Sequence, residues 1–267
     1  MHLLRLCLIV LCLTTPWESQ AAPLRYAGAT TLQRDFMPEA TRLYEKETGT
    51  DFRIQGGNTV PGLRALLNGD VEIAGAGRFL SVTEKEAGLV ETLIGWDAMS
   101  VIVHRDNPVS NLTLDQLRNI FSGSVQNWRE VGGQDQAILV VATPPGSGMR
   151  SMSEQLILKG KSPLTSKAIM APLVHDADQQ VARFPMAITV LSQSMLDADG
   201  VKRLPVDGML PEESLFGEGG YPLVKPLLLV TRSDPDAATA AFIRFALSDP
   251  AQQLLKKKFY PLKHTLP

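Results

Sequence analysis

Short apolar runs alternate with amphipathic segments along most of the chain. In the amphipathic segments, apolar residues recur every three or four positions, as Phe36, Ala40, Leu43 and Tyr44 do before Gly49, which is typical of helices. The apolar runs have the length of strands and cover residues 24–27, 52–55, 71–74, 99–104, 137–142, 168–174, 187–191, 201–205 and 227–231. This alternation predicts an α/β fold.

Local signals mark where the other helices begin and end. Thr113 and Gln116 have the spacing of a capping box, which predicts a helix that Gly123 ends. Another helix is expected to begin at Pro61 and to end before Gly69, and a further one, which contains Ser151 and Glu154, should end near Gly160. Two more helices are expected at 236–247 and 250–257.

The first 21 residues have the features of a secretory signal peptide. Arg5 precedes an apolar run at 8–13 that is too short to span a bilayer, and small residues follow at 19–21. We therefore expect cleavage after Ala21 and a periplasmic mature protein. Cys7 and Cys12 would be removed with this segment, so the mature chain would have no disulfide and no cysteine site.

The composition and net charge argue against several classes of binding partner. The 267 residues carry a net charge of −2, with 44% hydrophobic and 20% charged residues, which is typical of a globular domain. No basic field is present to attract nucleic acid or anionic lipid. His104, His175 and His264 are far apart and lack the spacing of metal ligands, so we expect neither a metal nor a cofactor.

Four expected connections between a strand and a helix are rich in glycine, threonine and serine. Main-chain N–H groups at a helix start favour an anion, and hydroxyl groups add further donors. Arg78 and Arg150 could add charged, forked hydrogen bonds to an oxyanion. Any one such loop is more often a simple helix cap, but four of them predict an anion-binding α/β protein. The loops are 28–31, 56–59, 75–78 and 145–150.

These loops and several other motifs resemble the periplasmic phosphate-binding proteins of ABC importers, which are PstS-like members of the type 2 periplasmic binding protein superfamily. The motifs follow the family order over nearly the whole mature chain. They lie at 28–31, 56–63, 69–78, 107–133, 146–150, 185–188, 206–208, 221–223 and 245–248.

The resemblance implies a monomeric binding protein without enzymatic activity. Its two α/β lobes would be joined by two hinge strands and would enclose a small oxyanion, with phosphate as the first candidate, for delivery to an ABC permease. Lobe 1 would comprise 22–96 and 191–267, and lobe 2 would comprise 97–190. The implied ligand-binding residues are Thr30, Thr31, Thr59 and Arg78 from lobe 1 and Ser147, Gly148, Met149 and Arg150 from lobe 2.

The chain departs from the family pattern near the second hinge, at 186–190, and at three positions that would offer donors to the ligand. Gly77 replaces a usual serine, Met149 replaces a usual threonine, and Thr143 stands where an arginine is frequent. Losing these donors should weaken binding or change the ligand, because unmet polar groups are costly in an enclosed site. An alternative is therefore a periplasmic sensory or adaptor protein of the same fold that signals to a membrane partner.

Two further alternatives concern single residues. Arg150 could brace its loop by pairing with a carboxylate instead of contacting the ligand. Ser147 has a glycine on each side, as some nucleophiles do, but the sequence shows no base for a hydrolase.

Overall fold

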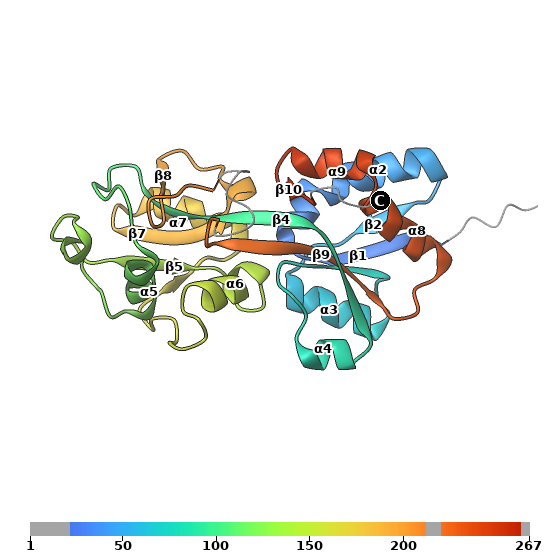
Figure 1. Cartoon of the computed structure of the whole chain (residues 1–267), viewed down its shortest axis with the longest axis horizontal. Coiled ribbons are helices and arrows are strands. Elements are labelled where there is room, and N and C mark those ends of the chain that lie inside the picture. Colours follow the sequence, from blue (N-terminus) through green and yellow to red (C-terminus); the bar gives the residue numbers. More distant parts are fainter. Residues whose placement is uncertain (1–21, 212–219, 263–267) are drawn as a thin grey trace, which may run out of the picture.

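The computed structural model describes residues 22–211 and 220–262. Within these ranges the chain forms two α/β lobes joined by the long strands β4 and β9 (Figure 1). The predicted α/β class is confirmed. The expected signal peptide, with Cys7 and Cys12, lies outside the described residues.

The strands form one continuous sheet in the order β2-β1-β3-β9-β4-β7-β5-β6, and β8 and β10 each pair with β4. β1 is parallel to β2 and β3, and β5 is parallel to β6 and β7. β9 is antiparallel to β3, and β4 is antiparallel to β9 and β7. The strands are β1 (Leu24–Gly28), β2 (Phe52–Ile54), β3 (Ile73–Ala76), β4 (Leu89–His104), β5 (Leu139–Ala142), β6 (Ile169–Met170), β7 (Ala187–Ser192), β8 (Val201–Leu204), β9 (Val224–Arg232) and β10 (Tyr260–Pro261).

β4 is long enough to belong to both lobes. Its first part pairs with β9, and its last part, from Met99 onward, pairs with β7 and β8. The sequence predicted a strand only over 99–104, because polar and half-exposed residues interrupt the apolar pattern in the preceding part.

Helices cover both faces of the sheet. The predicted capping box of Thr113 and Gln116 is confirmed. The helix expected from Pro61 begins two residues earlier, at Thr59, and the helix containing Ser151 is capped by Ser147. The helices are α1 (Thr30–Asp35), α2 (Met37–Thr48), α3 (Thr59–Asn68), α4 (Val82–Glu86), α5 (Leu114–Ser122), α6 (Gly148–Leu156), α7 (Ala177–Arg183), α8 (Ala237–Ala246) and α9 (Asp249–Lys256), with 3-10 turns η1 (Trp128–Val131), η2 (Val174–Asp176) and η3 (Gln193–Met195).

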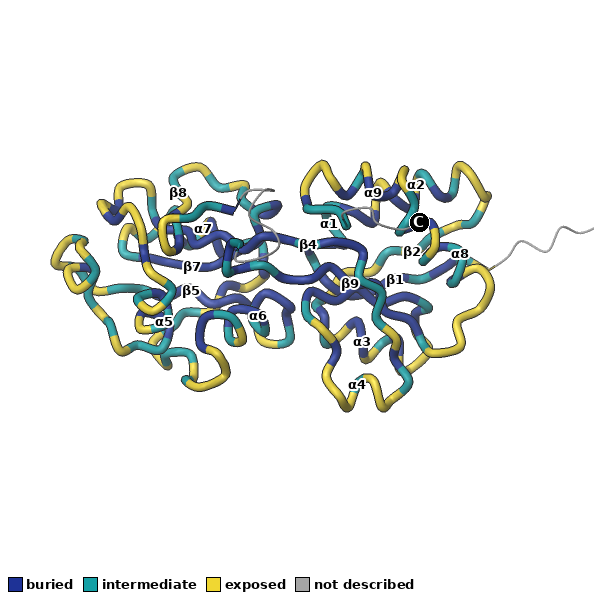
Figure 2. The backbone as a smooth tube through the Cα atoms, viewed as in Figure 1, coloured by how far each residue is buried: buried dark blue, intermediate teal, exposed yellow. Residues whose placement is uncertain are grey.

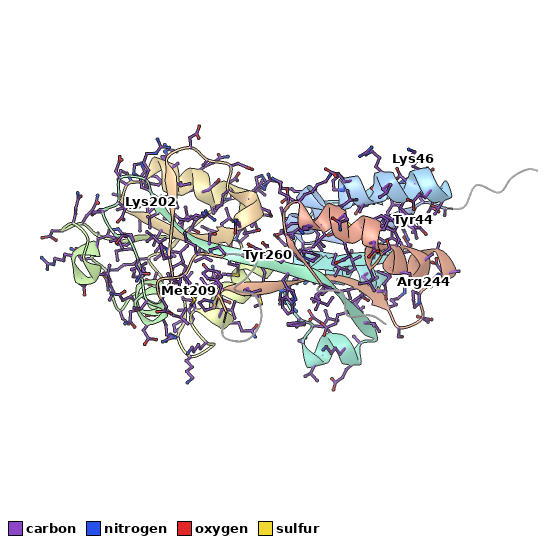
Figure 3. The ribbon with its side chains drawn as sticks, turned by 45° about the horizontal axis from the view of Figure 1, so that its top comes forward. Tyr44, Lys46, Lys202, Met209, Arg244 and Tyr260 are labelled. Carbon is purple, nitrogen blue, oxygen red and sulfur yellow. The ribbon has the colours of Figure 1, made fainter. Side chains whose placement is uncertain are left out.

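Each lobe has its own hydrophobic core, and buried segments concentrate inside both lobes and along β4 and β9 (Figure 2). In lobe 1, Tyr44 packs edge-on against Phe242, with ring centroids 5.3 Å apart. Lys202 and Met209 lie on the other lobe, far from Tyr44 (Figure 3).

The core of lobe 2 extends beyond the predicted boundary at residue 190. Leu191, Met195, Leu204, Tyr221 and Leu223 pack into the same buried cluster as the residues of β5, β7 and α6. The segment after β7 returns along β4 as β8, which keeps it on lobe 2. We therefore propose that lobe 2 runs from residue 97 to about 224, in place of the predicted 97–190.

Candidate anion-binding site

The predicted loops connect strands to helices. Residues 28–31 lead from β1 into α1, residues 56–59 from β2 into α3, and residues 145–150 from β5 into α6, while residues 77–78 follow β3. Since β1, β2 and β3 are parallel, the three loops of lobe 1 emerge at the same edge of the sheet. The loop of lobe 2 faces them.

The loops of the two lobes are in direct contact. The N–H of Val60 in α3 donates a hydrogen bond to the carbonyl oxygen of Gly146, at 3.1 Å. Gly148 lies so close to lobe 1 that an added Cβ would be 2.8 Å from Cα of Gly77 and 3.0 Å from Oγ1 of Thr59. The structure thus brings Thr59, Gly77 and Gly148 together.

Main-chain and hydroxyl donors converge at this contact. The N–H groups of Gly148 and Met149 open α6 and have no acceptor among the described residues. The hydroxyl oxygen of Thr59 accepts a hydrogen bond from the N–H of Gly77, at 3.1 Å, which leaves its own proton for a ligand. The Met149 side chain is buried in the core of lobe 2, so this residue offers only its N–H.

Other predicted residues use their hydroxyl groups within their own lobe. Thr30 donates to the carbonyl oxygen of Gly57, at 3.0 Å, and links two loops of lobe 1. The Ser147 hydroxyl donates to the carbonyl oxygen of Pro144 and accepts from the N–H of Arg150, so it caps α6. Thr31 is buried in the first turn of α1.

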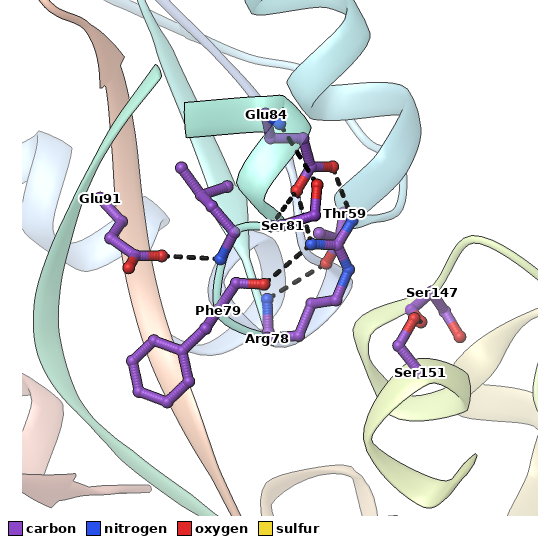
Figure 4. A network of polar contacts seen from close by, with 10 residues as sticks. Thr59, Arg78, Phe79, Ser81, Glu84, Glu91, Ser147 and Ser151 are labelled. Carbon is purple, nitrogen blue, oxygen red and sulfur yellow. Dashed lines mark hydrogen bonds and ion pairs between the residues drawn. The ribbon is translucent and has the colours of Figure 1, made fainter. Parts of the chain in front are cut away.

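The Arg78 side chain points toward α4 of its own lobe (Figure 4). Its two terminal nitrogens lie 2.8 and 2.7 Å from the two carboxylate oxygens of Glu84. The bond from Arg78, with help from the N–H of Ser81, lowers the pKa of Glu84 to about 2. Because a carboxylate already balances the Arg78 charge, contact between Arg78 and an anion stays a prediction.

Arg150 is also paired within its own lobe. Its Nε lies 2.5 Å from Glu154 one turn later in α6, and one terminal nitrogen donates to the carbonyl oxygen of Thr143, at 3.4 Å. This is the bracing contact that the sequence left open as an alternative.

Sequence reasoning missed a buried ion pair at the hinge. Lys225 of β9 and Asp97 of β4 are register partners, each only 1% exposed, with Nζ 2.8 Å from Oδ2. The ammonium group also lies beside the ligand loops, because a Cβ added to Gly77 would be 3.4 Å from it. Lys225 is therefore the buried cation at the contact between the lobes.

A second set of contacts joins the lobes through α1 and the segment after β7. Ser194 donates to Asp35, at 2.9 Å, and Arg34 forms an ion pair with Asp197, at 2.8 Å. Burial raises the pKa of Asp35, although the bond from Ser194 opposes this shift. These contacts hold the lobes together on the α1 side.

Replacing Arg78 with alanine is expected to lower the free energy of unfolding by about 1–3 kcal/mol at neutral pH, because two charge-assisted bonds are lost. The pKa of Glu84 falls from 4.5 to about 2 on folding, so the pair stabilises the protein fully above pH 4.5 and progressively less toward pH 2. Urea unfolding at pH 7 and pH 3 checks this prediction. A difference from wild type that grows at pH 3 would contradict it.

Across 22–211 and 220–262, histidine, cysteine, aspartate and glutamate nowhere gather in a group of three that could hold a metal ion. Within the same ranges, every helix is too short or too polar to cross a membrane.

Comparisons with known proteins agree with this architecture. Residues 13–250 match a family model described as a PBP superfamily domain. The phosphate-binding protein PstS of Bacillus subtilis is 28% identical over 240 residues, which are 88% of this chain and 79% of that protein.

Two solved structures are similar over nearly the whole fold. A putative phosphate ABC transporter substrate-binding protein with bound phosphate, from Clostridium perfringens, superposes with a TM-score of 0.83 at 27% identity and covers 91% of this chain and 100% of its own. An ABC-type phosphate transport receptor from Vibrio cholerae has a TM-score of 0.76 at 27% identity and covers 90% and 100%. These relatives support a binding protein, as predicted, and not an enzyme. The chain belongs to the PBP superfamily, the family of two-lobed periplasmic binding proteins that its loops resemble.

Proposed function

We propose that this chain is a periplasmic, monomeric solute-binding protein that captures phosphate between its lobes and delivers it to an ABC permease. The observation that carries this proposal is the meeting of α3 and α6, from opposite lobes, beside the buried ammonium group of Lys225. The free N–H groups at the start of α6 and a buried cation together suit a small tetrahedral oxyanion. The named relatives bind phosphate or serve phosphate transport.

The departures from the family pattern favour a second candidate, a sensory or adaptor protein with weak anion binding. A Cβ at position 77 would lie 3.4 Å from the Lys225 ammonium group. Gly77 therefore lacks the hydroxyl donor that the usual serine would place at the contact between the lobes. The Met149 side chain turns into the core of lobe 2 and supplies no hydroxyl. The N–H groups of Gly148 and Met149 in α6 and the hydroxyl group of Thr59 remain, which is why capture of phosphate stays the first candidate.

Calorimetric titration of the dialysed protein with phosphate, arsenate, sulfate and molybdate tests the proposal. We expect phosphate to bind and to raise the melting temperature, because a ligand at 100 times its Kd stabilises the native state by about 2.7 kcal/mol. Binding should also reduce the radius of gyration in solution scattering as the hinge closes. If none of the four anions bound at millimolar concentration, the adaptor candidate would replace this one.

A further inference from the structure

We propose that Lys225 is the residue that supplies the positive charge to the oxyanion, with Asp97 as its permanent counter-charge. The inference rests on the proposed capture of an oxyanion between the lobes and names the side chain that makes it possible. Neither residue belongs to the loops that the sequence motifs single out.

Position is the first support for this role. Lys225 and Asp97 face each other on β9 and β4, the two strands that connect the lobes (Figure 1). The Lys225 ammonium lies next to Gly77 of lobe 1, whose backbone in turn touches Gly148 at the start of α6 in lobe 2. A charge at this point is within reach of an anion that contacts both lobes.

The direction of the hydrogen-bond donors is the second support. Nζ of Lys225 lies 2.8 Å from Oδ2 of Asp97, which is the distance of a charge-assisted contact and occupies one of its three N–H groups. The described residues offer the other two N–H groups no acceptor, so these can serve an anion. Burying donors without acceptors is costly, and a third group that meets them offsets that cost.

The two arginines of the loops are each anchored to a carboxylate of their own lobe. The donors of Arg78 are directed at both oxygens of Glu84, and Nε of Arg150 is bound to Glu154. Each arginine thus forms its ion pair within one lobe, whereas Lys225 lies on β9, a strand that connects the two lobes. Binding of an anion to Lys225 would draw the loops of both lobes toward the hinge and so favour closure.

The test is a calorimetric titration with inorganic phosphate of wild type, Lys225→Met, Asp97→Asn and the double variant Lys225→Met/Asp97→Asn. The double variant contains no buried charge at the hinge, so it keeps the test valid if Lys225→Met alone fails to fold. Lys202→Met is the matched control, because Lys202 also lies on a strand paired with β4 but belongs to β8 of lobe 2.

We expect Kd to rise at least about 30-fold in both variants that lack Lys225, as truncation of a buried charge partner does in other complexes. Asp97→Asn keeps the ammonium group and should bind phosphate within about fivefold of wild type, which is less than 1 kcal/mol. Lys202→Met should bind as wild type does. A merely structural pair would instead make Asp97→Asn as harmful as Lys225→Met.

The outcomes separate this inference from the proposed function. If wild type binds phosphate and the folded double variant binds it with a similar Kd, the assignment of Lys225 is overturned while the proposed function stands. If wild type binds none of phosphate, arsenate, sulfate and molybdate, both are overturned.

Discussion

Replacing Gly148 with alanine is expected to raise the Kd for phosphate roughly 5- to 150-fold. The added methyl group would lie 2.8 Å from Cα and 3.0 Å from the carbonyl carbon of Gly77, which are main-chain atoms of the opposite lobe. Because these atoms cannot rotate away, the lobes must stay further apart, and forcing an extra carbon into such a contact costs about 1–3 kcal/mol. The cost falls only on the closed form, where the lobes meet.

Gly77→Ala is the matched control, since it adds the same methyl group to the other side of the same contact. There the new carbon would lie 3.4 Å from Nζ of Lys225 and 3.5 Å from Cα of Gly148, which are ordinary van der Waals distances. We expect Gly77→Ala to bind phosphate several-fold more tightly than Gly148→Ala. Solution scattering with saturating phosphate should show a larger radius of gyration for Gly148→Ala alone. Equal affinities and equal radii would show that closure does not depend on this contact.

The sequence predicted the elements whose signals are local. The helix that Thr113 caps follows from residues a few positions apart, and so do the loops that precede α1, α3 and α6. The short helices α4 and α7 escaped prediction because each is a turn or two long and carries no long apolar repeat.

The proposed end of lobe 2, near residue 224, does not follow from a local pattern. The segment after β7 carries apolar residues that could pack on either lobe, and only the pairing of β8 with β4 decides the side. The lobe to which a segment belongs depends on the strand with which it pairs, and that pairing is between residues far apart in the sequence.

The sequence predicted the loops that meet between the lobes, but not the buried ion pair beside them. Arg78 and Arg150 were visible as cations, but the carboxylates that bind them come from the helices that follow. Lys225 and Asp97 each precede an apolar run, so the predicted strands at 227–231 and 99–104 exclude both residues. A charged residue beside such a run on each of two neighbouring strands is a usable signal, since β pairing can bury the two together.

Removing the Lys225 ammonium should have the largest effect on stability that the structure predicts. In Lys225→Met the Asp97 carboxylate would remain 1% exposed and lose its only ion-pair partner among the described residues. Breaking a buried pair from one side costs about 3–5 kcal/mol, because an uncompensated charge is left in a poorly solvated place. Urea unfolding of dialysed, phosphate-free protein measures this loss without a contribution from ligand binding.

The double variant shows whether charge or packing is responsible for that loss. In the Lys225→Met background, Asp97→Asn removes the uncompensated carboxylate charge. The double variant should therefore regain most of the stability, while its affinity for the anion stays low. Lys257→Met provides the comparison for an exposed pair, since Lys257 and Glu39 are 57% and 49% exposed and their separation should cost less than about 1 kcal/mol. If Lys225→Met and the double variant unfolded at the same urea concentration, the loss would come from side-chain packing on β9, and the electrostatic account of the hinge pair would be wrong.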